Sequence, residues 1–119
     1  MARILIADDA LFMRATLTRT LKEAGHEVVG EAETGVAAVN LAGELTPDLV
    51  MLDITMPEMD GLAALRKIRE THPQMPVIMC TALGQEAKVR EALGAGARDY
   101  VLKPFSPAKL LTAITRALG

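Results

Sequence analysis

The chain has 119 residues, of which 50% are hydrophobic, and its 13 basic and 15 acidic residues give a formal net charge of −2. This length fits one domain, residues 1–119, with a sizeable core, and the apolar content excludes a disordered chain. The charge balance offers no basic face for nucleic acid. No apolar run approaches the roughly 18 residues of a membrane helix, and a single cysteine excludes a disulfide within the chain. We therefore expect a cytoplasmic protein without a nucleic-acid or membrane partner.

Short apolar runs alternate with longer amphipathic segments five times along the chain. The apolar runs predict strands at residues 3–7, 27–32, 48–52, 77–80 and 99–102. The amphipathic segments predict helices at residues 10–24, 35–44, 61–71, 85–93 and 107–118. Residues suited to helix N-caps precede four of these helices: Asp8 or Asp9, Thr34, Asp60 and Ser106.

This alternation predicts an α/β domain with a doubly wound, five-stranded parallel sheet of the flavodoxin-like type, covered by helices on both faces. The strand at residues 27–32 is the least apolar of the five, so we place it at an edge of the sheet. The resulting strand order is 2-1-3-4-5. The order reverses between the first and third strands, and open α/β sheets bind their ligands at such a point.

Polar residues able to handle a phosphoryl group stand at the ends of four predicted strands. Asp8 and Asp9 follow the first strand, Asp53 the third, Thr81 the fourth and Lys103 the fifth. Each residue alone has an ordinary structural explanation, such as a helix cap, a turn or a solvated lysine. Those explanations do not predict that all five side chains meet at one edge of the sheet. We therefore interpret them as one site.

The chemistry of this set favours phosphoryl transfer to Asp53. A carboxylate can attack phosphorus to give an acyl phosphate, but neighbouring carboxylates such as Asp8 and Asp9 would repel the donor. A divalent cation such as Mg²⁺ would neutralise them, since it prefers oxygen ligands and phosphate oxygens. Lys103 would add a second positive charge and Thr81 a hydroxyl donor.

Three segments carry a resemblance to a known family. They are residues 4–13 (ILIADDALFM), 48–62 (DLVMLDITMPEMDGL) and 99–105 (DYVLKPF), together with Thr81-Ala82. With them the whole chain resembles the receiver domain of two-component response regulators, which implies the (βα)5 receiver fold.

The resemblance implies roles for individual residues. Asp53 would accept a phosphoryl group from a histidine kinase, and Mg²⁺ would be held by Asp8, Asp9, Asp53 and the backbone carbonyl of Thr55. Phosphorylation would draw Thr81 towards the phosphoryl oxygen and let Tyr100 turn inward. The last helices and strand would then present a changed surface to a target.

Within the family, residues 8–14 and 79–87 look most like the single-domain receivers of chemotaxis, and the chain ends with its last predicted helix. We therefore expect a stand-alone, monomeric receiver that is not a turnover enzyme and whose target is the flagellar motor switch or another protein. Two related alternatives stay open. One is a receiver cut from a DNA-binding regulator, and the other is a single-domain phosphorelay receiver in another pathway, such as sporulation.

Two rival classes are weaker. A flavodoxin-like electron carrier needs a phosphate loop and aromatic residues around its flavin, whereas Asp8 and Asp9 would repel the flavin phosphate. A phosphatase using Asp53 usually carries a second acid two residues on, where this chain has Thr55. Thr55 and Leu83 also predict slow self-dephosphorylation and a separate phosphatase. The Thr55 hydroxyl reaches less far towards the attacking water than an amide or acid would, and Leu83 has no hydrogen-bonding group and should partly cover the approach.

Overall fold

The computed structural model describes all 119 residues as five strands that alternate with five helices. The strands are β1 (Arg3–Ala7), β2 (Glu27–Ala32), β3 (Leu49–Asp53), β4 (Val77–Thr81) and β5 (Asp99–Leu102). The helices are α1 (Leu11–Glu23), α2 (Gly35–Leu45), α3 (Gly61–Thr71), α4 (Glu86–Gly94) and α5 (Pro107–Leu118). None of these helices has the length and apolar character needed to cross a membrane.

All five strands run parallel in the order β2-β1-β3-β4-β5, so the predicted topology is confirmed. The polar strand β2 lies at an edge of the sheet and pairs with β1 only. The order reverses between β1 and β3, which pair with each other from Ile4 with Leu49 to Ala7 with Leu52. The ends of β1 and β3 are therefore side by side at the carboxyl edge of the sheet.

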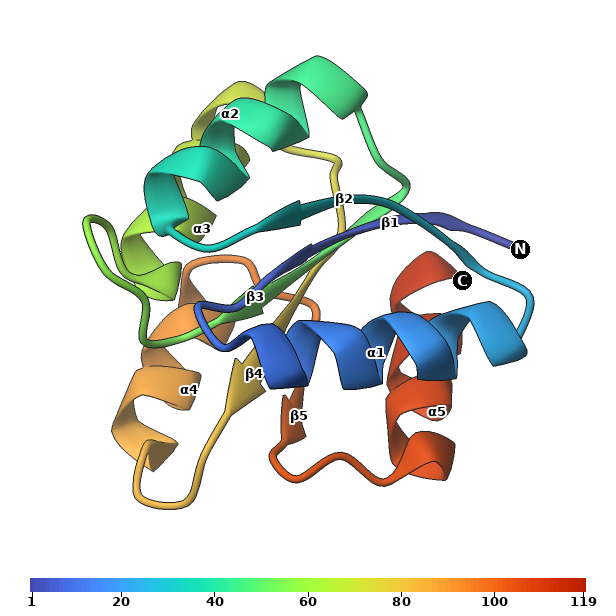
Figure 1. Cartoon of the computed structure of the whole chain (residues 1–119). Helices are drawn as coiled ribbons and strands as arrows, with labels where there is room; N and C mark the ends of the chain where they lie inside the picture. Colours follow the sequence, from blue (N-terminus) through green and yellow to red (C-terminus); the bar gives the residue numbers. More distant parts are fainter.

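Helices cover both faces of the sheet (Figure 1), and the strand residues alternate between two apolar cores. Leu5, Leu52 and Met79 pack with side chains of α2, α3 and α4. Ile6, Met51 and Cys80 pack on the opposite face with α1 and α5. Burial of both faces explains why β1, β3 and β4 are apolar apart from one terminal residue each, which is Arg3, Asp53 or Thr81. The buried core is aliphatic, and the chain has only three aromatic residues, Phe12, Tyr100 and Phe105.

Side-chain caps begin three helices as expected. The Thr34, Asp60 and Ser106 side chains accept hydrogen bonds from the backbone N–H groups of Ala37, Ala63 and Lys109. The predicted cap of α1 by Asp8 or Asp9 is wrong, because Ala10 is its N-cap and no side chain caps it. The Asp8 carboxylate instead accepts a hydrogen bond from the N–H of Ala10 and turns the chain towards the helix.

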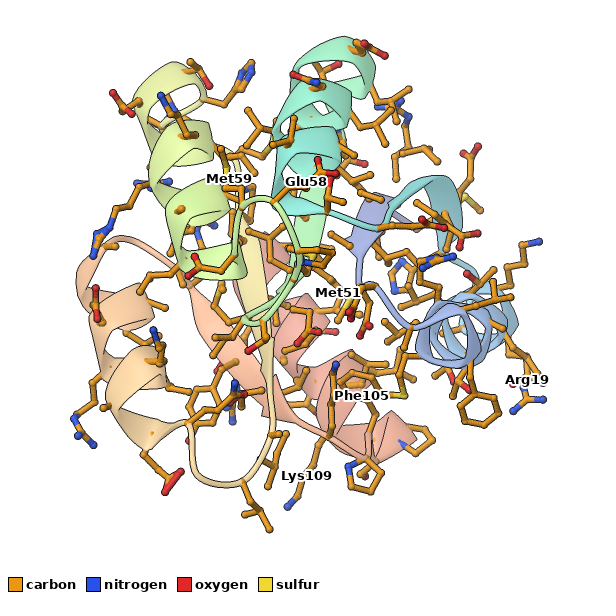
Figure 2. All side chains as sticks on the ribbon, turned by 60° about the vertical axis from the view of Figure 1, so that its left-hand side comes forward. Arg19, Met51, Glu58, Met59, Phe105 and Lys109 are labelled. Atoms are coloured by element: carbon orange, nitrogen blue, oxygen red, sulfur yellow. The ribbon has the colours of Figure 1, made fainter.

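The other differences from the predicted boundaries are one residue at an end. The third and fourth strands extend to Asp53 and Thr81, so both residues are fixed by the sheet rather than carried by a loop. The loop from β3 to α3 contains Glu58 and Met59, which Figure 2 labels beside the start of α2. Glu58 adopts a left-handed φ of 67° in this turn.

Candidate functional site

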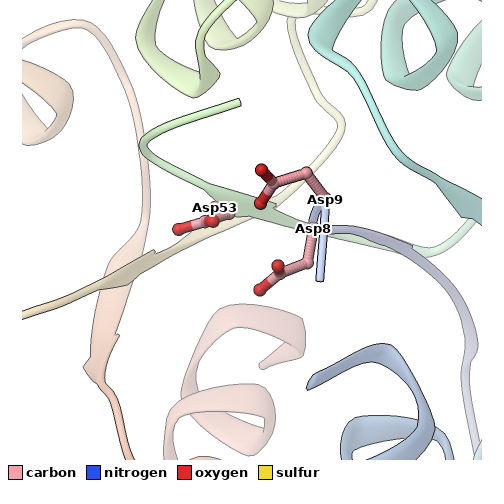
Figure 3. Close-up of side chains that lie close together, drawn as sticks. All are labelled: Asp8, Asp9 and Asp53. Atoms are coloured by element: carbon pink, nitrogen blue, oxygen red, sulfur yellow. The ribbon is translucent and has the colours of Figure 1, made fainter. Parts of the chain in front are cut away.

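Three carboxylates meet where β1 and β3 end (Figure 3). Asp8 and Asp9 follow β1, and Asp53 is the last residue of β3. One carboxylate oxygen from each lies within 4.8 Å of the others, which is close enough to hold a common metal ion. Asp8 and Asp53 are 1% and 7% exposed, whereas Asp9 is open to solvent. The cluster thus combines two buried carboxylates with one that solvent reaches.

Lys103 reaches this cluster from the segment after β5. Its Nζ lies 2.7 Å from Asp8 Oδ2 and 3.1 Å from Asp53 Oδ1. Burial alone would lower the pKa of Lys103, but the hydrogen bond to Asp8 and the charge of Asp53 outweigh burial and raise the pKa. Lys103 therefore stays protonated between the two carboxylates.

The environment of Asp53 disfavours its charge. Burial raises the pKa of Asp53 above its ordinary value, and the charges of Asp8 and Asp9 act in the same direction, while Lys103 opposes them. A carboxylate held this way gains from a further positive charge nearby. The donor set is suited to Mg²⁺, which prefers carboxylate oxygens and leaves positions for water and phosphate.

Thr81 lies on the neighbouring strand. Asp53 pairs with Cys80, so Thr81 is one residue further towards the carboxyl edge. The Thr81 side chain is buried, and its Oγ1 lies 3.1 Å from Gln85 Oε1 and 3.2 Å from the carbonyl oxygen of Ala82. The structure therefore brings all five predicted residues to one edge.

The remaining predicted residues lie around this edge. Thr55 is exposed two residues beyond Asp53, and its Oγ1 accepts a hydrogen bond from Gln85 Nε2 at 3.0 Å. Tyr100 on β5 is 46% exposed, which is an outward position. Leu83, which we expected to cover the approach to Asp53, is 83% exposed and borders a groove along β5 and α5. The side chain that reaches between Thr81 and Thr55 is Gln85.

Two residues whose side chains contact the site, Gln85 and Arg14, were not predicted from the sequence. Arg14 on α1 is 6% exposed, and its guanidinium donates hydrogen bonds to the carbonyl oxygen of Asp8 at 2.7 Å and to the carboxylates of Glu31 and Glu33. A signal for Arg14 existed, because it lies on the same helix face as the buried Leu17 three residues later. No pattern pointed to Gln85, whose role depends on how its side chain folds back.

This arrangement defines the class of protein. The Asp53 carboxylate lies beside two more carboxylates, the Lys103 ammonium group and the end of the strand that carries Thr81, at the topological switch point of a doubly wound sheet. Residues 4–115 match the family model of the response regulator receiver domain, and the chain belongs to that family.

The relatives point to chemotaxis. The chain is 50% identical to the chemotaxis protein CheY of Bacillus subtilis over 117 residues, which are 98% of both chains. It is 47% identical to CheY of Thermotoga maritima over 114 residues, covering 96% of this chain and 95% of that one. The crystal structure of the CheX–CheY–BeF3–Mg²⁺ complex from Borrelia burgdorferi contains a similar fold, with a TM-score of 0.91 and 36% identity, covering 95% of this chain and 86% of that one. The chain is a CheY-like receiver, consistent with a chemotaxis response regulator.

Proposed function

We propose that this receiver accepts a phosphoryl group on Asp53 from a histidine kinase and signals by binding a target protein. The observation that carries the proposal is the position of Asp53, buried at the end of β3 within reach of two carboxylates and 3.1 Å from the Lys103 ammonium. A site built only for stability would not gather three carboxylates at one point, since like charges repel each other.

Asp8, Asp9 and Asp53, with the backbone carbonyl of Thr55, would hold Mg²⁺. The bound ion would supply positive charge against the acidic cluster and the transferred group. The Asp53 carboxylate would attack phosphorus, so that a new O–P bond forms while the P–N bond of the donor phosphohistidine breaks. The histidine nitrogen leaves with the electron pair of that bond. Lys103 would pair with the new phosphoryl oxygens. The phosphoryl group would remain covalently bound to Asp53, so the reaction would not be a catalytic turnover.

Phosphorylation would act on the rest of the molecule through Thr81. Its hydroxyl would donate to a phosphoryl oxygen, and Tyr100 would turn from solvent into the space that Thr81 leaves. A shift of a two-state equilibrium from 1:99 to 99:1 needs about 5.5 kcal/mol. A hydrogen bond from Thr81 to the charged phosphoryl group would contribute roughly 1.5–3 kcal/mol. Lys103 already pairs with Asp8 and Asp53, so it adds only the difference between its bonds in the two states.

The partners follow from the relatives. The Borrelia burgdorferi CheY in complex with CheX carries BeF3 and Mg²⁺, which supports binding of protein partners by this fold in that state. We propose a chemotaxis kinase as donor, the flagellar motor switch or a comparable protein as target, and a separate phosphatase. The chain would act as a monomer in the cytoplasm.

The test of the acceptor uses a small phosphodonor. Incubation with acetyl phosphate and Mg²⁺ should add one phosphoryl group, which intact-mass and peptide mass spectrometry would place on Asp53. Asp53→Asn should abolish the addition, because an amide is not a nucleophile for phosphorus. Asp48→Asn is the matched control, since Asp48 lies at the opposite end of β3 and its carboxylate accepts a hydrogen bond from the N–H of Arg3. Equal labelling of Asp53→Asn and wild type would refute the assignment.

A further inference from the structure

The Gln85 side chain connects three segments at the rim of the acidic site. Its Oε1 accepts hydrogen bonds from the Thr81 hydroxyl at 3.1 Å and from the Ala82 backbone N–H at 2.8 Å. Its Nε2 donates to Thr55 Oγ1 at 3.0 Å. One half-buried amide thus joins the end of β4, the start of α4 and the loop after β3.

The position of Gln85 in the chain makes these bonds unusual. Gln85 is the N-cap residue of α4, yet its side chain does not cap that helix. The amide folds back over the β4–α4 connection instead. The α4 helix therefore lacks the side-chain cap that Ser, Thr, Asp or Asn would supply. The Gln85 amide instead forms its hydrogen bonds with Thr81, Ala82 and Thr55.

We propose that Gln85 is a positioning residue that holds the Thr81 hydroxyl away from the phosphoryl site while Asp53 is unphosphorylated. This inference rests on the proposed function. We call the bond between Thr81 Oγ1 and Gln85 Oε1 the Gln85 latch. Its opening is a step of switching, and its strength sets part of the balance between the two states.

The reason for the latch is that a hydroxyl carries one proton. The Thr81 hydroxyl lies within donating distance of both Gln85 Oε1 and the carbonyl oxygen of Ala82. Its single proton cannot also go to a phosphoryl oxygen, so the bond to the phosphoryl group forms only if these bonds break. A hydrogen bond to an ionised oxygen is stronger than one to a neutral amide, so the Thr81 hydroxyl should bind the phosphoryl oxygen in preference to Gln85. The free energy gained from this new bond is reduced by that of the bond to Gln85 that is lost, because only the difference between the states shifts the equilibrium.

Removal of the latch should favour the phosphorylated state. We expect Gln85→Ala to bind beryllofluoride, in the presence of Mg²⁺, about two- to tenfold more tightly than wild type, which is the range set by the net strength of one neutral hydrogen bond. Affinity would be measured by following backbone amide resonances during a titration. Gln85→Met keeps the length of the side chain without its polar atoms and should act in the same direction.

Gln74→Ala is the matched control, because Gln74 is exposed in the loop before β4, at the opposite end of that strand. It should leave beryllofluoride affinity unchanged. In wild type, the side-chain amide resonances of Gln85 should also shift when beryllofluoride binds. A residue that only stabilised the fold would lower the unfolding midpoint of its variant without raising this affinity.

A double-mutant cycle tests the mechanism itself. In a Thr81→Ala background no hydroxyl remains to be held, so Gln85→Ala should add no further change in affinity. An equal gain in both backgrounds, or no gain in the wild-type background, would overturn the latch. No beryllofluoride binding by wild type would overturn the proposed function and the latch with it, so the two failures are distinguishable.

Discussion

His26 shows how a single side chain away from the site makes stability depend on pH. It lies between α1 and β2, and its Nδ1 accepts a hydrogen bond from the backbone N–H of Ala2 at 3.0 Å. Burial, followed by the charge of the N-terminal ammonium group, lowers the pKa of His26 below its ordinary value of 6.5. The unfolded chain therefore takes up the proton first as the pH falls.

The sign of the effect follows from this difference. The contribution of His26 to stability is fully present above pH 6.5 and is lost as the pH falls below that value towards the lowered pKa. Urea unfolding at several pH values between 7.5 and 5 should show this decline in the free energy of unfolding. His26→Asn offers an oxygen in place of Nδ1 and cannot titrate, so its decline should be smaller. His72→Asn is the control for the loss of a histidine elsewhere in the chain. If the free energy of unfolding had the same pH dependence in wild type and in His26→Asn, the assignment to His26 would be contradicted.

At this scale the sequence predicts some residues and not others. Asp8, Asp53, Thr81 and Lys103 could be placed because parallel strands bring their carboxyl ends to one edge, whatever the side-chain conformations. Gln85 could not, because its contacts depend on the path of a long side chain. Leu83 was expected to cover part of the approach to Asp53 by analogy with the family, but its side chain is 83% exposed and borders the groove along β5 and α5.

The start of α3 shows how closely a helix can approach the end of the strand that holds Asp53. The N–H of Gly61 donates to the carbonyl oxygen of Ile54 at 2.7 Å, and the Asp60 carboxylate caps the helix. A Cβ atom at Gly61 would collide with the carbonyl oxygen of Asp53. Only glycine lets the helix approach the end of β3 this closely.

We therefore expect Gly61→Ala to lower the free energy of unfolding by about 1–3 kcal/mol, the usual range for overpacking. Gly94→Ala is the matched control, because a Cβ there meets no atom within 4 Å. It should stabilise the protein by about 0.4–1 kcal/mol, since alanine restricts the unfolded chain more than glycine does. Both values come from urea unfolding. If the two variants proved equally stable, the close approach at Gly61 would not be a constraint.

Element boundaries could be predicted where a local signal fixes them. Thr34, Asp60 and Ser106 begin their helices because their side chains reach a backbone N–H three residues on, which is a local contact. The prediction that Asp8 or Asp9 caps α1 was wrong, because Asp8 has a partner far away in the sequence. Its carboxylate accepts from the N–H of Ala10 and pairs with Lys103, which is 95 residues away.

At the scale of the whole molecule, composition favoured the observed strand order without fixing it. The polar β2 suits an edge position, right-handed crossovers leave few other arrangements, and the resemblance to receiver domains implies the same order. The order brings three carboxylates together, so the fold carries a local electrostatic cost at its site. The raised pKa of Asp53, due first to burial and then to its acidic neighbours, is a sign of that cost.

A cation that binds only the folded cluster should reduce this cost for the whole protein. Binding stabilises the folded state by RT ln(1 + [L]/Kd), which is about 1.4 kcal/mol at a Mg²⁺ concentration ten times Kd. We therefore expect millimolar MgCl2 to raise the melting temperature, compared with NaCl at the same ionic strength. Asp9→Ala should lose most of this gain while leaving the fold intact, because Asp9 is exposed and has no hydrogen bond or ion pair through its carboxylate. Calorimetric scans of both proteins, with and without Mg²⁺, would measure the effect. If Mg²⁺ left the melting temperature of the wild type unchanged, the three carboxylates at the ends of β1 and β3 would form an acidic cluster but not a metal site.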